Sequence, residues 1–253
     1  MSLQSEFKEI AQTGGRAAMV TVVAGDDDVL GAKLLVRADG EASGSLGSPE
    51  LDARGVDYAE ELMWAERSEL RGDLFVDVVA PPPRLIVFGA VDFAAALCRM
   101  AKAAGWRPFV VDPRGRFATR ERFPDAEDVV VAWPEKAFAQ LGGIDRATYI
   151  AVLTHDPKLD DAALTAALAS EAPYIGAMGS RRAQEKRRER LVALGISDDQ
   201  LARIAAPIGL DLGGLTAEET ALSIVAEVVA VRNGREGGRL SAAGAGRIHE
   251  VGT

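Results

Sequence analysis

Between residues 84 and 231 the chain alternates short apolar runs with longer amphipathic stretches, and this alternation restricts its fold more than any other feature. The run at 84–88 ends at Gly89, an amphipathic stretch covers 93–104, and a second apolar run covers 107–111. Strand, helix and strand in this order form the βαβ unit of a parallel sheet. The pattern predicts further strands at 128–131, 149–153 and 174–178, and further helices at 159–169, 180–194 and 217–231.

The predicted strands of this region are almost continuously apolar. Strands of this composition are buried on both faces, as in a doubly wound sheet. We therefore expect residues 81–232 to form a Rossmann-like α/β domain, in which helices cover both faces of a parallel sheet. Residues 233–253 are rich in Gly and Ala and have little to bury, which is typical of a flexible C-terminal tail.

The first 80 residues show a different pattern, typical of a small β-rich α+β domain. The dipeptide Asp39-Gly40 lies between two apolar runs and favours a tight hairpin, because both positions tolerate positive φ. Ser48 and Pro49 suit a helix start, with a capping serine and a proline in the first turn. The three prolines from Pro81 to Pro83 can continue neither a helix nor a central strand, so we expect the domain boundary there. The predicted strands are 19–24, 29–36, 42–46 and 75–79, and the predicted helix is 48–69.

The composition argues against several classes of partner. The chain of 253 residues has a formal net charge of −9, whereas nucleic acids and anionic membrane surfaces attract basic proteins. No apolar run reaches the roughly 18 residues that span a bilayer. Cys98 is the only cysteine, so the chain cannot form an internal disulfide. We therefore expect a cytoplasmic protein that binds a small molecule or another protein.

Ligands of open parallel sheets bind beyond the carboxyl ends of the strands, and the first such turn here begins at Gly89. It stands where dinucleotide-binding proteins carry three glycines, but only Gly89 is kept. Val91 replaces the glycine that lets backbone approach a pyrophosphate, and Asp92 adds negative charge. The turn thus argues against ordinary NAD(P) binding. Asp112 ends the next strand, where it either hydrogen-bonds a ribose or only terminates the strand.

Two later strand ends carry polar side chains suited to an anionic ligand. The fourth predicted strand of the domain ends in Thr154-His155-Asp156, where His155 belongs either to a site or to the structural framework. The fifth ends in Gly179-Ser180-Arg181, where the backbone donors of a helix N-terminus and the arginine favour a phosphate. The basic run that follows is expected to face solvent, including Arg187 and Arg188.

Asp211 lies between apolar residues in a glycine-rich segment before the last predicted helix. The pattern indicates either a carboxylate held by a tight loop or only the approach to a capped helix, since Thr216 and Glu219 form a capping box. We expect one functional site along the carboxyl edge of the sheet, made of Asp112, His155, Gly179, Ser180, Arg181 and Asp211.

Taken in order, these segments resemble the XdhC/CoxI family of xanthine dehydrogenase accessory factors. The resemblance spans residues 84 to 231 and rests on the Gly89 turn, Asp112 to Arg114, Phe117-Ala118, Arg122-Phe123-Pro124, Thr154-His155-Asp156, Asp160, Tyr174-Ile175-Gly176, Gly179 to Arg182 and Pro207 to Asp211. It implies a chaperone, more than an enzyme, that binds molybdenum cofactor while a cysteine desulfurase supplies its terminal sulfur. The chaperone would then pass the cofactor to a molybdenum hydroxylase apoenzyme, and a homodimer is also implied. The implied cofactor-binding residues are Gly89, Asp112, Arg114, His155, Asp156, Gly179, Ser180, Arg181 and Asp211.

The N-terminal region is less similar to the family's smaller domain. A Gly-Gly-Gly-Cys-Val-Glu-like stretch of the family appears here as Gly47-Ser48-Pro49-Glu50-Leu51, without the cysteine. Two other functions stay open: an NAD(P)-dependent oxidoreductase with a degenerate fingerprint, and a scaffold without a ligand. The altered Gly89 turn argues against the first, and the polar strand ends argue against the second.

Overall fold

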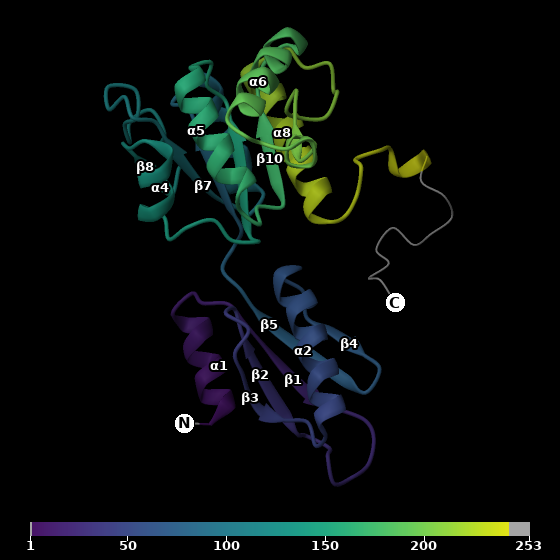
Figure 1. Ribbon diagram of the computed structural model, residues 1–253. Helices are drawn as coiled ribbons and strands as arrows, with labels where there is room; N and C mark the ends of the chain where they lie inside the picture. The colour runs from purple at the N-terminus through teal and green to yellow at the C-terminus, as the bar shows by residue number, and fades with distance from the viewer. Residues whose placement is uncertain (1, 243–253) are drawn as a thin grey trace. The chain divides into compact units, whose positions relative to one another are not determined.

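The computed structural model describes residues 2–242, which divide into two compact units on either side of the bond between Pro81 and Pro82 (Figure 1). Most of the predicted C-terminal tail, residues 243–253, lies outside the described residues. The described part of that tail ends in a turn of 3-10 helix, Leu240–Ala242.

The first unit is a five-stranded antiparallel sheet with a helix on each face. In chain order its elements are α1 (Leu3–Gln12), β1 (Ala17–Val22), β2 (Lys33–Arg37), β3 (Ala42–Ser45), α2 (Pro49–Trp64), β4 (Glu69–Arg71) and β5 (Leu74–Val79). The strand order is β3-β2-β1-β5-β4. Because side chains alternate along a strand, Ala18 and Val20 of β1 pack in the cluster under α2, while Ala17 and Met19 pack in the cluster under α1.

The end of α2 differs from the predicted helix at 48–69, because the helix stops at Trp64. Glu66 adopts a positive φ of 53°, and the amide of Arg67 donates to the carbonyl of Leu62 at 3.1 Å, which closes the helix end. The buried Arg16 supports this end by donating to the carbonyl of Met63 at 2.7 Å and pairing with Glu66 at 2.9 Å. The sequence shows no glycine at this position that would have signalled the stop. The predicted strand at 29–36 was also wrong at its start, since β2 begins at Lys33 after two turns.

The second unit is a six-stranded parallel sheet in the order β11-β10-β9-β6-β7-β8. Its elements are β6 (Arg84–Phe88), α3 (Asp92–Ala103), β7 (Arg107–Val111), β8 (Asp128–Val130), α4 (Pro134–Gln140), β9 (Thr148–Val152), α5 (Pro157–Leu168), β10 (Tyr174–Ala177), α6 (Arg181–Ala193), α7 (Asp198–Leu201), β11 (Ile204–Ala205) and α8 (Ala217–Arg232). Counted from β6, this is the strand order 3-2-1-4-5-6 of the doubly wound dinucleotide-binding fold. The predicted α/β architecture is confirmed.

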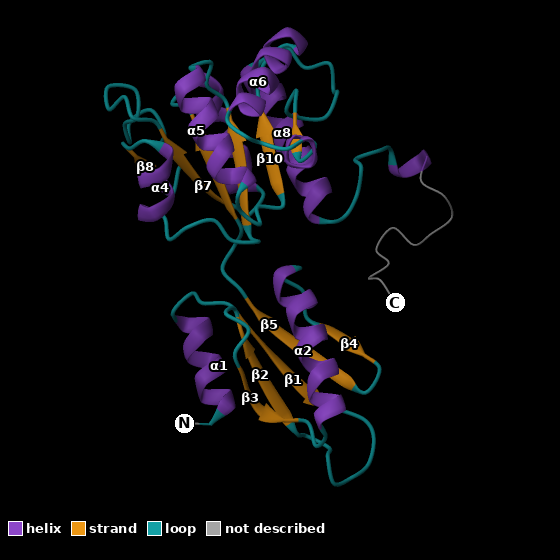
Figure 2. Ribbon diagram, in the orientation of Figure 1, coloured by secondary structure: helices purple, strands orange, loops and turns teal. Residues whose placement is uncertain are grey.

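Helices cover both faces of the parallel sheet (Figure 2). Helices α3 and α8 share one apolar cluster with alternate strand residues such as Val87 and Val110. Helices α4, α5 and α6 contribute to the cluster on the other face, which includes Ile86 and Ile150. The sequence pattern missed α4, α7 and β11, because elements of seven, four and two residues are too short to show a period.

Candidate functional site

The order in which the chain adds strands to the parallel sheet reverses between β6 and β9. Strands β7 and β8 follow on one side of β6, and β9, β10 and β11 follow on the other. Ligands of this architecture bind at such a reversal of strand order. Phe88 at the end of β6 pairs with Val111 of β7 on one side and with Val152 of β9 on the other, and Val152 pairs with Ala177 of β10. The turns after β7, β6, β9 and β10 are therefore neighbours along one edge. They contain every predicted site residue except Asp211, up to Arg181 as the first residue of α6.

Gly89 adopts a φ of 108° at this reversal, in a region that side chains rarely reach. A Cβ built at this position would lie 3.1 Å from the amide nitrogen of Thr154, so β6 and the end of β9 approach as closely as backbone allows. Val91 is the N-cap of α3 and offers no side-chain cap to that helix. The glycine thus serves the contact between two strand ends.

Asp112 is fully buried directly after β7, and its carboxylate is occupied by the protein. It accepts hydrogen bonds from the amides of Ala90 and Arg114, both at 2.9 Å, and binds the Arg114 guanidinium through both oxygens at 2.9 and 2.7 Å. Burial opposes ionisation, but the Arg114 guanidinium and the two amides hold the pKa of the Asp112 carboxyl below its usual range. Asp112 therefore fixes the Gly89 turn and Arg114, and its carboxylate is not free to meet a ribose.

Three guanidinium groups surround Phe117 in the loop after β7. The distance from the guanidinium carbon to the ring centroid is 5.0 Å for Arg114, 4.4 Å for Arg116 and 6.0 Å for Arg122. Arg122 also donates to the carbonyl of Ala90 at 2.9 Å and pairs with Asp92 at 3.0 Å. Asp92 therefore meets a positive charge at the turn, which the sequence did not indicate. The signal was present as three arginines within a short segment after Asp112, but their common contact with one ring needs the folded loop.

The turn after β9 presents His155 and Asp156 at the surface. Asp156 caps α5 by accepting a hydrogen bond from the amide of Lys158 at 3.0 Å. The hydrogen bond to Asp112 raises the pKa of the Arg114 guanidinium, and the charge of Asp156 adds a smaller effect in the same direction. The exposed ring of His155 forms no hydrogen bond or ion pair with residues 2–242.

The turn after β10 combines a glycine, a helix cap and an exposed arginine. Gly179 has a φ of 136°, and Ser180 caps α6 by accepting from the amide of Ala183 at 3.3 Å. Arg181 is exposed and forms no ion pair within the described part of the chain. The amides of Gly179 and Ser180 likewise donate to no described group. Free backbone donors, a helix N-terminus and a free guanidinium form a favourable environment for a phosphate.

Two family models match the two units of the chain separately. Residues 85–228 match the XdhC Rossmann domain, and residues 10–72 match the XdhC and CoxI family. The chain belongs to the XdhC and CoxI family. The match covers the parallel sheet with all four strand-end turns described above, and it extends to the N-terminal unit.

Curated relatives of this XdhC/CoxI chain are similar at low identity. They include the uncharacterized protein YqeB of Escherichia coli, which is 23% identical over 94% of this chain and 48% of its own length. A probable xanthine dehydrogenase subunit of Bacillus subtilis is 29% identical over 63% of this chain and 46% of its own. The molybdenum cofactor insertion chaperone PaoD of E. coli is 31% identical over 60% of this chain and 41% of its own. The chain thus spans about half the length of these relatives.

A solved structure shares the fold of this XdhC/CoxI chain. The crystal structure of a xanthine dehydrogenase from Bacillus halodurans superposes with a TM-score of 0.62 at 23% identity. The similarity covers 90% of this chain and 66% of the other. It extends the agreement in fold over both units.

Arg187 corrects the expectation that the basic run of α6 faces solvent. Its side chain is buried and pairs with the buried Asp160 of α5 at 2.9 Å. Arg187 and Leu191 are the buried residues of α6, one helical turn apart on the face toward the sheet. The expectation rested on the number of basic residues in the run, and that number does not show that one face of the helix packs against the sheet. Arg188 does reach the surface, where it pairs with the exposed Asp198 at 2.6 Å.

Asp211 is exposed in the loop that leads from β11 to α8, and the amide of Ile208 in the same loop donates to the carbonyl of Ala177 at the end of β10 at 3.1 Å. Leu210, the residue before Asp211, attaches the loop to Ser223 of α8. The amide of Leu210 donates to the carbonyl of Ser223 at 3.2 Å, and the Ser223 hydroxyl donates to the carbonyl of Leu210. Thr216 and Glu219 form the predicted capping box of α8. The loop is thus held by its backbone, and the Asp211 carboxylate takes no part in holding it.

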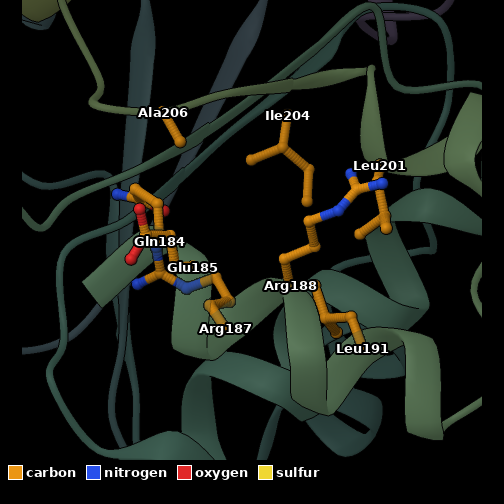
Figure 3. A pocket seen from close by; sticks show the side chains of 8 residues that line it. All are labelled: Gln184, Glu185, Arg187, Arg188, Leu191, Leu201, Ile204 and Ala206. Atoms are coloured by element: carbon orange, nitrogen blue, oxygen red, sulfur yellow. The ribbon is translucent and has the colours of Figure 1, made fainter. Parts of the chain in front are cut away.

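A surface pocket of about 270 Å³ lies against α6, α7 and β11 (Figure 3). Leu191, Leu201 and Ile204 form its apolar part, and Gln184 and Arg187 lie together on another wall. Gln184 and Arg187 of α6 therefore line the pocket and also hydrogen-bond to the turn after β10.

Residues 2–242 contain no group of three or more His, Cys, Asp or Glu side chains placed to hold a metal ion. In the same part of the chain, no helix has the length and apolar character needed to cross a membrane.

Proposed function

We propose that this chain binds molybdenum cofactor as cargo and delivers it to a molybdenum hydroxylase apoenzyme of the xanthine dehydrogenase type. Membership of the XdhC and CoxI family is the observation that carries the proposal, because two relatives are named as a molybdenum cofactor insertion chaperone and a probable xanthine dehydrogenase subunit. The apoenzyme, a cysteine desulfurase and a second copy of this chain are the proposed partners.

The chemistry of the carboxyl edge supports an anionic cargo. Molybdenum cofactor carries a phosphate on its pterin, and the N-terminus of α6 offers free amides of Gly179 and Ser180 beside Arg181. His155 follows β9, the neighbour of β10, and the loop of Arg114 and Arg116 follows β7, which β6 separates from β9 at the same edge. We assign the phosphate to the turn after β10 and the rest of the cargo to the edge between β10 and β7.

The sulfur chemistry would belong to a partner. Cys98 is the only cysteine of the chain and is fully buried in α3. Burial raises the pKa of its thiol to about 12, so Cys98 stays a protonated thiol and cannot act as a sulfur relay. A chain of this kind can hold the cofactor while another protein supplies sulfur.

The proposal is tested by purifying the chain from cells that make molybdenum cofactor, oxidising it, and measuring pterin fluorescence per chain. We expect a fluorescent pterin in the wild type and a clear loss in Arg181→Ala. Protein without pterin, which also fails to take up cofactor released from a purified molybdenum enzyme, would contradict the proposal.

An NAD(P)-dependent oxidoreductase is the second candidate, and the strand order of the parallel sheet favours it. The loss of two of the three fingerprint glycines at Val91 and beyond opposes it, as does the occupied carboxylate of Asp112. Calorimetric titration with NAD and NADP separates the two functions.

A further inference from the structure

Arg187 holds the turn after β10 from inside the protein. Its Nη2 donates to Asp160 Oδ2 and to the carbonyl of Met178, both at 2.9 Å, and its Nη1 donates to the side-chain oxygen of Gln184. The Gln184 amide group in turn donates to the carbonyls of Ala177 at 3.3 Å and Gly179 at 3.2 Å. Two side chains of α6 thus hold three consecutive carbonyls of the turn.

Holding these carbonyls also orients the amides that follow them. In a trans peptide the N–H points away from the preceding C=O. When the carbonyls of Met178 and Gly179 point to α6, the amides of Gly179 and Ser180 must point away from it. These amides have no acceptor within the described residues. Like the first N–H groups of other helices, they are free to bind water or a ligand.

The ion pair is a poor device for stability alone. The side chains of Arg187 and Asp160 are 6% and 4% exposed, and Arg187 Nε lacks a hydrogen-bond partner within the described chain. Burial raises the pKa of the Asp160 carboxyl, although Arg187 and Thr154 both act to lower it. Desolvation of two charges with incomplete hydrogen bonding often costs more than their attraction returns, and an apolar pair can replace them without loss. Arg187 also donates to the carbonyl of Met178, so the pair can serve to orient the turn after β10.

We propose that Arg187 is a positioning residue of the candidate site, which fixes the turn of Met178, Gly179 and Ser180 so that its amides face the phosphate of the cargo. The identity of that anion rests on the proposed function. Asp160 lies on α5, whose cap Asp156 belongs to the turn after β9, so the same pair joins two turns of the site. Figure 3 shows Gln184 and Arg187 together on one wall of the pocket beside α6.

A second ion pair between the same helices provides a matched control. Arg190 binds Asp161 through both oxygens at 2.7 and 2.9 Å. Its remaining hydrogen bond, at 3.4 Å, goes to the carbonyl of Lys186 within α6 and not to the turn. The two pairs share chemistry and helices. They differ in contact with the turn and in burial, since the side chains of Arg190 and Asp161 are 35% and 16% exposed.

The test compares Asp160→Leu/Arg187→Met with Asp161→Leu/Arg190→Met in the full chain, after thermal unfolding has verified that both are folded. The reporters are the amides of Met178, Ala183 and Gln184, which donate to Val152, Ser180 Oγ and the Ser180 carbonyl. We expect their hydrogen exchange to be about tenfold faster in the first variant and unchanged in the second. Wild-type rates in the first variant, or equal acceleration in both, would overturn the inference.

Binding is the second readout, with cofactor released from a purified molybdenum enzyme as the probe. Affinity should fall about tenfold in Asp160→Leu/Arg187→Met and stay unchanged in Asp161→Leu/Arg190→Met. Arg187→Lys should be intermediate, because it keeps the charge but loses the planar set of donors. A wild-type chain that binds no cofactor would contradict the proposed function, whereas the exchange rates would still decide the role of Arg187.

Discussion

The hydroxyl of Tyr174, at the start of β10, donates a hydrogen bond to Glu227 of α8, which also accepts from the amide of Gly209 at 2.8 Å. Burial and the Glu227 carboxylate both raise the pKa of the Tyr174 phenol, so it remains a donor throughout the accessible pH range. One carboxylate thereby ties β10 and the loop before α8 together.

Tyr174→Phe should lower the free energy of unfolding by about 1 kcal/mol, because Glu227 loses one of two donors in a partly buried place. Urea unfolding measures the loss. Tyr58→Phe is the control, since no described group hydrogen-bonds to the Tyr58 hydroxyl. Equal effects of the two changes would show that the bond to Glu227 contributes nothing.

Gly89→Ala should destabilise the chain by about 1–3 kcal/mol, because the new side chain is strained at a φ of 108° and approaches Thr154. Gly105→Ala also introduces a side chain at positive φ, 81°, but meets nothing within 4 Å. Thermal or urea unfolding of both separates the cost of the dihedral angle from that of the contact. A smaller loss at Gly89 than at Gly105 would contradict the close approach of β6 and β9.

Asp112→Asn should lower the free energy of unfolding at neutral pH by about 1–3 kcal/mol, because the ionic bonds to Arg114 are lost. The folded chain lowers the pKa of Asp112 below its unfolded value of about 3.9, so the stabilisation is complete above that value and is lost as the pH falls through the folded pKa. Unfolding curves of wild type and variant should therefore differ at pH 7 and converge in acid. A difference that grows toward low pH would reverse the assigned direction.

Arg181→Ala should reduce affinity for a phosphorylated pterin about tenfold, since a hydrogen bond to a charged group contributes about 1.5–3 kcal/mol. Arg188→Ala removes the same charge from the same helix, but Arg188 is occupied with Asp198. Its removal should leave affinity almost unchanged. Equal losses at both positions, measured by fluorescence titration, would mean that α6 acts as a diffuse basic surface.

NAD and NADP should bind weakly or not at all, because Val91 crowds the place of the pyrophosphate. Pairing with Arg122 reduces the repulsion expected from Asp92, so we expect Val91→Gly to improve nucleotide binding more than Asp92→Asn does. Isothermal titration calorimetry checks both variants. Micromolar affinity of the wild type would contradict this prediction.

The parallel sheet was predictable because each long element carried its own signal. Apolar runs ending in Gly89, Asp112 or Gly179 mark the strand ends, and capping chemistry at Ser180 and Thr216 marks the helix starts. The helix end at Glu66 was not predictable, because a glutamate takes the left-handed position with the support of Arg16, a residue distant in the sequence.

The candidate site was predictable in its positions but not in the occupation of its side chains. Strand ends identify which residues share an edge, since parallel strands end together. They do not tell that Asp112 is saturated by Arg114, or that Arg187 turns inward to Asp160. Such partners depend on the spacing between helix and sheet, which a one-dimensional pattern does not contain.

The pairing of Phe88 in β6 with Val152 in β9 has a consequence during synthesis. When β6, α3 and β7 have left the ribosome, the Gly89 turn has β7 beside it but not yet β9. The edge that is proposed to hold the cargo closes only after β9, β10 and the first turn of α6 have emerged. A nascent chain would thus be unable to capture its cargo before strands β6 to β10 and the start of α6 have been made.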